Sequence, residues 1–240
     1  MIRENFSADA QALGIALNDA QLTAFRRYQD TLLDKNRRLN LTSITTPDEV
    51  QIKHFLDSLT GLALLPATAG LRVIDVGTGA GFPGIPLKIA RPDLRLTLLE
   101  ATRKKAGFVE RLTHLLGLAQ VSVIWERAEV LAHDPAHRER YDVALARAVA
   151  ALPTLLELLL PFCRVGGACI AWKGPQAEEE VIAAEEALAL VGGRLREVRK
   201  DRLPGPDEPA RSLIVVDKVA PTPKRYPRRP GIPAKRPLTP

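Results

Sequence analysis

Residues 73–87 read VIDVGTGAGFPGIPL, and this stretch limits the possible folds more than any other feature of the chain. An apolar, β-branched run stops at Asp75, and glycines follow at the alternating positions 77, 79 and 81. Glycine lets the backbone turn with positive φ and lets a ligand approach the main chain closely. The stretch therefore predicts a buried strand that ends in a ligand-binding turn, a device of α/β sheets.

Strand-like and helix-like segments alternate over most of the chain. Strands are expected at 71–77, 94–100, 121–126, 141–147, 167–173, 194–200 and 212–218. Helices are expected between them at 84–91, 103–116, 151–162 and 176–191. This alternation indicates a mostly parallel sheet with helices on both faces. The last two strands are joined only by a loop with Pro204, Gly205, Pro206 and Pro209, so we expect an antiparallel pair at the sheet edge.

The first sixty-odd residues have a helical pattern instead. Residues 18–39 carry apolar side chains at near-helical spacing. A second helix is expected to begin at Thr46, which can cap it, and to run to about Leu65. The chain is thus divided into an N-terminal helical segment (1–65), an α/β domain (66–220) and a basic, proline-rich tail (221–240).

The basic excess of the chain lies in that tail. The net charge is +6, and the tail alone supplies six cations and no acid: Lys224, Arg225, Arg228, Arg229, Lys235 and Arg236. Basic tails favour polyanions such as nucleic acid, and the alternative is a solubilising terminus without a fixed partner. Because the tail holds seven prolines, we expect it to be extended and without regular structure.

Several classes of site are not indicated. Cys163 and Cys169 lie six positions apart, which matches no zinc-ligand spacing, and we expect no metal site. The longest apolar run, near 150–163, contains Pro153 and Glu157 and is too short to span a bilayer. With no signal-like segment at its start, the chain is expected in the cytoplasm.

A second acid supports a nucleoside-containing ligand. Glu100 closes the second expected strand, 21 residues after Gly79, where a carboxylate can accept hydrogen bonds from ribose hydroxyls. The glycine spacing is G-x-G-x-G, because position 82, the third glycine of a dinucleotide loop, is Phe82. The alternative is a tight turn that holds no ligand.

These residues resemble a known family. D-V-G-T-G-A-G at 75–81 looks like the cofactor loop of Rossmann-like S-adenosylmethionine-dependent methyltransferases, and the longer string at 73–87 resembles the RsmG (glucose-inhibited division protein B) family. The resemblance continues in order through N-L-T-S-I (40–44), H-F-L-D-S-L (54–59), A-R-A-V-A (146–150), W-K-G (172–174), R-S-L (211–213) and the ending at 226–238. It implies methylation of N7 of a guanine in bacterial small-subunit ribosomal RNA, with S-adenosylmethionine as cofactor. The expected partner is that RNA or an assembling small subunit, and a monomer is expected.

The resemblance also implies site residues. Cofactor contacts are expected at Gly77, Gly79, Gly81, Phe82, Glu100, Ala101, Thr102, Ala128, Glu129 and Arg147. Candidates to hold the RNA are Arg147, Lys173, Arg211, Lys104, Lys105, Arg225, Arg228 and Arg229. Three of these assignments have a purely structural alternative. These alternatives are core packing for Phe82, a salt bridge on the sheet rim for Arg147, and a solvated helix face for Lys104 and Lys105.

The residues after the fourth strand bear on the methyl acceptor. Methylation of an exocyclic amine typically uses Asp or Asn, two prolines and an aromatic there, whereas this chain has Ala146-Arg147-Ala148-Val149. Neither cysteine stands where a nucleophile would be needed. Guanine N7 has a free lone pair and can attack the methyl group directly. We therefore expect no general base, with Arg147 and Lys173 as positioning residues.

Two other hypotheses stay open. One is a methyltransferase for a ribose hydroxyl or a protein, in which Lys173 belongs to a deprotonating group. The other is a nucleotide-binding oxidoreductase, or an RNA-binding protein that has lost activity. The glycine spacing argues against the oxidoreductase, and the intact glycines and Glu100 argue against lost activity.

Overall fold

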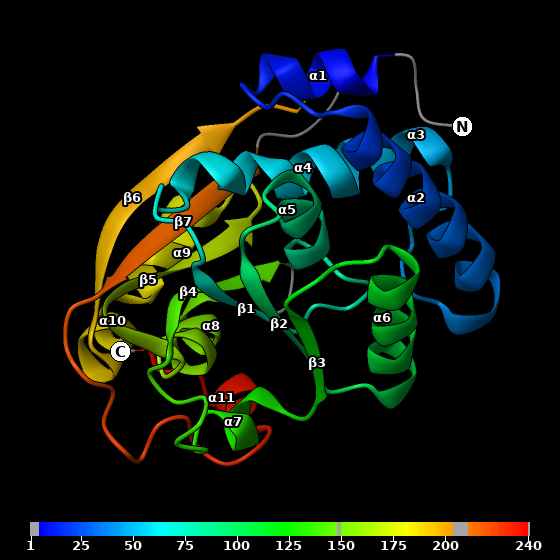
Figure 1. Ribbon diagram of the computed structural model, residues 1–240. Coiled ribbons are helices and arrows are strands. Elements are labelled where there is room, and N and C mark those ends of the chain that lie inside the picture. Colours follow the sequence, from blue (N-terminus) through cyan, green and yellow to red (C-terminus); the bar gives the residue numbers. More distant parts are fainter. Residues whose placement is uncertain (1–4, 148–149, 204–210, 240) are drawn as a thin grey trace.

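A seven-stranded sheet forms the centre of the computed structural model, which describes residues 5–147, 150–203 and 211–239 (Figure 1). Its strand order is β3-β2-β1-β4-β5-β7-β6. The strands are β1 (Arg72–Val76), β2 (Arg95–Glu100), β3 (Val121–Trp125), β4 (Tyr141–Arg147), β5 (Cys163–Lys173), β6 (Gly193–Asp201) and β7 (Arg211–Lys218). Strands β1 to β5 pair in parallel, and β7 pairs antiparallel with both β5 and β6. The predicted fold class and the antiparallel pairing of the last two strands are confirmed.

Helices cover both faces of the sheet. One set is N-terminal: α1 (Phe6–Ala12), α2 (Asp19–Leu39), α3 (Pro47–Glu49), the π-helical η1 (Val50–Leu56), α4 (Asp57–Leu59) and the 3₁₀-helical η2 (Thr60–Leu64). The others are α5 (Gly84–Ala90), α6 (Arg103–Leu115), α7 (Ala128–Leu131), α8 (Leu152–Leu159), α9 (Ala177–Ala183), α10 (Glu185–Val191) and α11 (Ile232–Lys235).

Alternate residues of each strand point to opposite faces, so the sheet separates two apolar cores. Val143 and Leu145 of β4 pack with the N-terminal helices, α5 and α6. Ala144 and Ala146 pack with α7 to α10. The N-terminal helices therefore complete one face of the sheet, because their buried side chains share its core.

Two predicted helices are interrupted. The one expected from Thr46 to about Leu65 changes from α to π geometry, returns to α over Asp57–Leu59 and ends as a 3₁₀ turn. The Ser58 hydroxyl donates to the backbone of His54 and the Thr60 hydroxyl to that of Asp57, and such bonds compete with regular helical pairing. The one expected over 176–191 begins at Ala177 and is broken at Ala184.

The prediction of an extended C-terminal tail is wrong. Residues 221–239 pack against the domain and contain α11. Tyr226 and Leu238 bury their side chains in the core on the α8 face. The Arg138 guanidinium donates to the carbonyl oxygens of Thr222, Pro223 and Tyr226, which satisfies main-chain groups that a proline-rich segment cannot pair within itself. The loop predicted at Pro204, Gly205, Pro206 and Pro209 lies outside the described residues.

Candidate active site

The glycine loop follows β1 at the carboxyl end of the sheet. Gly77, Gly79 and Gly81 have φ values of 72°, 61° and 106°. Residues that carry a side chain rarely adopt such positive φ values. The loop is tied to the neighbouring strand, because the N–H groups of Gly77 and Thr78 both donate to the Leu99 carbonyl oxygen, at 2.8 and 3.1 Å. The predicted turn is confirmed.

The Asp75 side chain holds the glycine loop in place through hydrogen bonds. Its side chain is fully buried, and Oδ2 accepts hydrogen bonds from the Thr78 hydroxyl at 2.7 Å and the Gly84 N–H at 2.9 Å. A Cβ on Gly84 would lie 2.8 Å from the same oxygen, so glycine is needed there. Burial raises the pKa of Asp75 to about 6. Asp75 therefore holds the loop through Oδ2, whereas its buried Oδ1 has no hydrogen-bond partner among the described residues.

Glu100 joins the loop to the start of α6. Its Oε2 accepts from the Gly79 N–H at 2.9 Å, and its Oε1 accepts from the Thr102 N–H at 2.7 Å. Each carboxylate oxygen can accept a further hydrogen bond. The position suits the predicted ribose contact, which stays a prediction.

A cavity of about 220 Å³ opens beside the loop, and we call it the first cavity. It brings together four of the predicted cofactor residues, which are Gly77, Ala101, Ala128 and Glu129. The wall is completed by Val76, Leu99, Glu126, Arg127, Ala150, Thr154, Leu158, Pro233 and Ala234. The last two come from the C-terminal segment, which the sequence did not connect with this site.

Arg147 ends β4 and points toward the N-terminal helices. Its Nη1 lies 2.9 Å from Asp57 Oδ2, and its Nη2 lies 2.9 Å from His54 Nδ1. Because a guanidinium can only donate, Nδ1 accepts and the imidazole proton lies on Nε2, which is 2.8 Å from the Thr42 hydroxyl. Burial, reinforced by the Arg147 charge, lowers the pKa of His54 to about 3, so the ring is neutral at physiological pH. Ala148 and Val149, which follow in the sequence, lie outside the described residues.

Phe82 packs in an aromatic cluster. Its ring stacks on Tyr28 and His54, with centroids 5.2 and 4.4 Å away, and is 5% exposed. The Tyr28 hydroxyl donates to the Ala80 carbonyl oxygen at 2.7 Å, so α2 also fixes the glycine loop. The core-packing alternative thus describes the Phe82 ring, and a cofactor contact from this residue stays a prediction.

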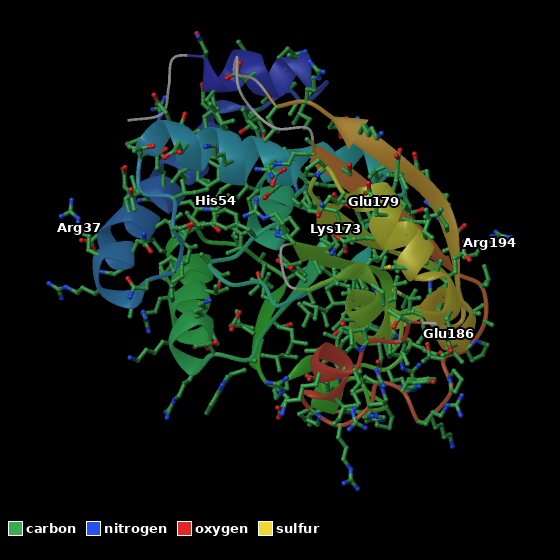
Figure 2. The ribbon with its side chains drawn as sticks, turned by 180° about the vertical axis from the view of Figure 1, so that it is seen from behind. Arg37, His54, Lys173, Glu179, Glu186 and Arg194 are labelled. Carbon is green, nitrogen blue, oxygen red and sulfur yellow. The ribbon has the colours of Figure 1, made fainter. Side chains whose placement is uncertain are left out.

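A second cavity, of about 300 Å³, lies at the ends of β4 and β5. It brings together Arg147, Lys173 and Arg211, and its wall also includes Ile44, Lys53, His54, Asp57, Trp172 and Gly174. Seen from behind, His54 and Lys173 lie toward the middle of the molecule, whereas Arg37 and Arg194 project from opposite sides (Figure 2).

The charges around the second cavity are partly paired. Lys173 Nζ lies 2.6 Å from Glu180 Oε2, and Arg211 Nε lies 3.7 Å from Asp57 Oδ1. Asp57 therefore faces two guanidinium groups, those of Arg147 and Arg211. A cavity built this way keeps an excess of positive charge.

The other predicted RNA contacts lie apart from both cavities. Lys104 is exposed and Lys105 half-buried on α6, while Arg225 and Arg229 are exposed on the C-terminal segment. Arg228 is different, because it makes an ion pair with the fully buried Glu157, Nη2 to Oε2 being 2.7 Å. Its charge serves the fold, which argues against the predicted RNA contact.

Some residues that line the two cavities have no role predicted from the sequence. His54 and Asp57 stand three positions apart, a spacing that places both on one face of a helix, and this was the available signal. Trp172 donates from Nε1 to the Asp57 carbonyl oxygen at 2.8 Å. Pro233 and Ala234 gave no local signal, because they lie in a proline-rich tail.

The cysteines are placed as expected for small buried residues. Burial raises the pKa of Cys163 to about 12 and that of Cys169 well above its ordinary value. Within the described ranges, no group of three His, Cys, Asp or Glu side chains is arranged to hold a metal ion. No helix in the same part of the chain is both long and apolar enough to cross a membrane.

Comparisons with known proteins agree on one family. The family model described as "GidB: rRNA small subunit methyltransferase G" matches residues 21–204. A protein named ribosomal RNA small subunit methyltransferase G from Pelotomaculum thermopropionicum is 48% identical over 238 residues, which are 99% of each chain. The protein of the same name from Dehalococcoides mccartyi strain CBDB1 is 50% identical over 227 residues, covering 95% of this chain and 96% of its own.

Solved structures support the fold. An S-adenosylmethionine-dependent O-methyltransferase from Thermotoga maritima superposes with a TM-score of 0.52 at 18% identity, covering 79% of this chain and 71% of its own. At this identity the likeness concerns the fold alone.

Proposed function

Because the chain belongs to the rRNA small subunit methyltransferase G family, we propose that it transfers a methyl group from S-adenosylmethionine to N7 of one guanine in small-subunit ribosomal RNA. The observation that carries the proposal is the glycine loop, bound through Gly79 to the Glu100 carboxylate beside the first cavity. Left-handed glycines let a cofactor approach the main chain, and Glu100 offers acceptors to its ribose.

The two cavities divide the reactants. Gly77, Ala101 and Ala128 line the first cavity and would hold the adenosine end of the cofactor. The glycine loop would hold its methionine end on the side of Phe82, whose ring lies against Arg147. Arg147 also lines the second cavity, so a methyl acceptor held there would adjoin the loop.

The second cavity receives the target guanine. The guanidinium groups of Arg147 and Arg211 share one carboxylate, that of Asp57, and the remaining positive charge suits a phosphate or the guanine O6. A base can enter this cavity only when it is splayed from its helix, because the major groove of paired RNA is deep and narrow.

Two contacts and the burial of both cysteines support direct attack by N7 without a general base. The lone pair of His54 Nδ1 accepts from Arg147, so the imidazole is not free to take another proton. Lys173 is ion-paired with Glu180, which disfavours the hydroxyl-acceptor alternative in which it deprotonates the substrate. Cys163 and Cys169 are buried with raised pKa values and line neither cavity.

Calorimetric titration tests the cofactor. We expect S-adenosylmethionine and S-adenosylhomocysteine to bind and NADH not to bind, and the reverse result would favour an oxidoreductase.

The methyl acceptor is tested by the single-turnover rate at saturating RNA and cofactor. That rate should vary little between about pH 6.5 and 9, because N7 needs no deprotonation. A rate rising tenfold per pH unit would reveal a base.

The partner and setting follow from the same proposal. The substrate is the ribosomal RNA or an assembling small subunit in the cytoplasm, and the enzyme acts as a monomer. Comparing methylation of naked RNA, assembly intermediates and complete small subunits identifies the substrate form. Light scattering of the free protein tests the monomer.

A further inference from the structure

The C-terminal segment, residues 221–239, reaches the first cavity and supplies part of its wall. Pro233 and Ala234 line the cavity together with residues that follow β2 and β3, such as Ala101 and Ala128. They belong to α11, which Figure 1 shows beside α7 and near α8. A segment predicted to be a free tail therefore lies at the nucleoside end of the proposed cofactor site.

Two hydrogen bonds fix the segment to the cavity wall. The Gly231 N–H donates to Glu129 Oε1 at 2.9 Å, and the same oxygen accepts from Arg127 Nη2 at 2.6 Å. The Thr154 hydroxyl donates to the Pro233 carbonyl oxygen at 3.0 Å. Glu129 and Thr154 are buried and themselves line the cavity, so these bonds set where Pro233 and Ala234 lie.

A buried ion pair holds the segment just before the cavity. Glu157 of α8 is fully buried, and it accepts from the Arg228 backbone N–H at 2.7 Å and from Arg228 Nη2 at 2.7 Å. A buried carboxylate without a partner is strongly destabilising, so the fold requires Arg228 at this place. The hydrogen bond to Glu157 raises the pKa of Arg228, although partial burial opposes the shift.

We infer that the C-terminal segment is part of the cofactor site, and that Pro233 and Ala234 contact the adenosine moiety of S-adenosylmethionine. The inference rests on the proposed function, since it takes S-adenosylmethionine as the ligand of the first cavity. It gives residues 221–239 a role in binding the cofactor, in addition to the RNA contacts expected from their charge. The residues around Arg228 serve the cofactor pocket, and only the exposed cations of the segment are left to meet RNA.

The test enlarges the side chain that lines the cavity. Ala234 lines the cavity and is exposed, so Ala234→Phe places a large side chain at the cavity wall without disturbing the core. The matched control is Lys235→Phe, which places the same ring on the next residue of α11, outside the cavity lining. We expect Ala234→Phe to weaken S-adenosylhomocysteine binding at least about tenfold in calorimetry, with the control and the melting temperature unchanged. Ala234→Leu should give a smaller loss and replaces Ala234→Phe if that variant does not fold.

Methylthioadenosine, which lacks the amino-acid end of the cofactor, locates the effect. Its binding should weaken by the same factor in Ala234→Phe, because the change lies at the adenosine end. If both ligands bind both Ala234 variants as they bind the unaltered protein, the inference is overturned while the proposed function stands. If the unaltered protein binds neither ligand, it is the proposed function that fails.

Discussion

The guanidinium carbon of Arg147 lies 4.8 Å from the centre of the Phe82 ring, so the end of β4 rests on the last turn of the glycine loop. Stacking of a cation on an aromatic ring is favourable, and here it is combined with the ion pair to Asp57 and the hydrogen bond to His54. This arrangement connects the cofactor loop with the second cavity.

Arg147→Ala should slow methyl transfer strongly and lower the melting temperature, because the buried Asp57 carboxylate loses the nearer of its two guanidinium partners. The same variant should raise the pKa of His54 from about 3, since one of the two main causes of its lowering is removed, while burial keeps it below the ordinary 6.5. NMR titration measures the His54 pKa. The control is Arg164→Ala, which breaks an exposed ion pair to Asp142. An unchanged His54 pKa would contradict the described contact.

Glu100→Ala should weaken S-adenosylmethionine binding by about ten- to a hundredfold, because a hydrogen bond to a charged group is worth about 1.5–3 kcal/mol. The change also frees the Gly79 and Thr102 N–H groups, which loosens the loop. Calorimetric dissociation constants for this variant and for Glu110→Ala, an exposed acid on α6, decide the point. If both variants bind S-adenosylmethionine with the same affinity, Glu100 does not contact the cofactor.

Asp75 gives the protein a characteristic dependence of stability on pH. Its pKa is raised from 3.8 to about 6 by burial, so the folded state holds the proton more tightly than the unfolded state. The stabilisation is present below about pH 4 and is lost as the pH rises through about 6. Asp75→Asn removes this titration. Its unfolding free energy, relative to the unaltered protein, should therefore rise by about 3 kcal/mol between pH 3.5 and 7.

Asp142→Asn is the control of opposite sign for that experiment. Burial works to raise the pKa of Asp142, but hydrogen bonds from Arg164 and the Arg72 N–H outweigh it and lower the pKa. Urea unfolding across the pH range compares the two variants. Parallel pH profiles for Asp75→Asn and the unaltered protein would show that Asp75 has an ordinary pKa.

The exposed cations of the C-terminal segment should contact RNA phosphates. Changing Arg225 and Arg229 together to Gln should weaken RNA binding and reduce the slope of log affinity against log salt by about 1.4–1.8. Cofactor affinity should not change, since neither residue lines the first cavity. Arg194→Gln serves as the control, because Arg194 projects from the edge strand β6 (Figure 2). A salt slope identical to that of the unaltered protein would show that these two arginines do not meet phosphates.

The parts of this site that could be predicted from sequence are those fixed by local pattern. The order of strand, glycine turn and helix, and the acid at the end of the second strand, place Gly79 and Glu100 beside each other once the second strand pairs in parallel with the first, as β2 does with β1. Their hydrogen bond follows from that placement.

The remaining parts depend on contacts between distant residues. The Arg147–His54 hydrogen bond joins positions 93 apart, and the helical pattern predicted from Thr46 to about Leu65 does not indicate which distant strand His54 will meet. The Arg228–Glu157 pair joins positions 71 apart. Composition predicted a free tail there, because proline content and charge say nothing about a buried carboxylate elsewhere in the chain.

The central claim is the transfer of a methyl group to guanine N7. The most direct measurement incubates the protein with isotopically labelled S-adenosylmethionine and small-subunit RNA from a strain that lacks the enzyme, and then identifies the labelled nucleoside by mass spectrometry. The account predicts labelled 7-methylguanosine at a single position, formed by the unaltered protein and strongly reduced with Arg147→Ala. A label found on a ribose hydroxyl, on another base or on protein, or no transfer in the presence of bound cofactor, would contradict it.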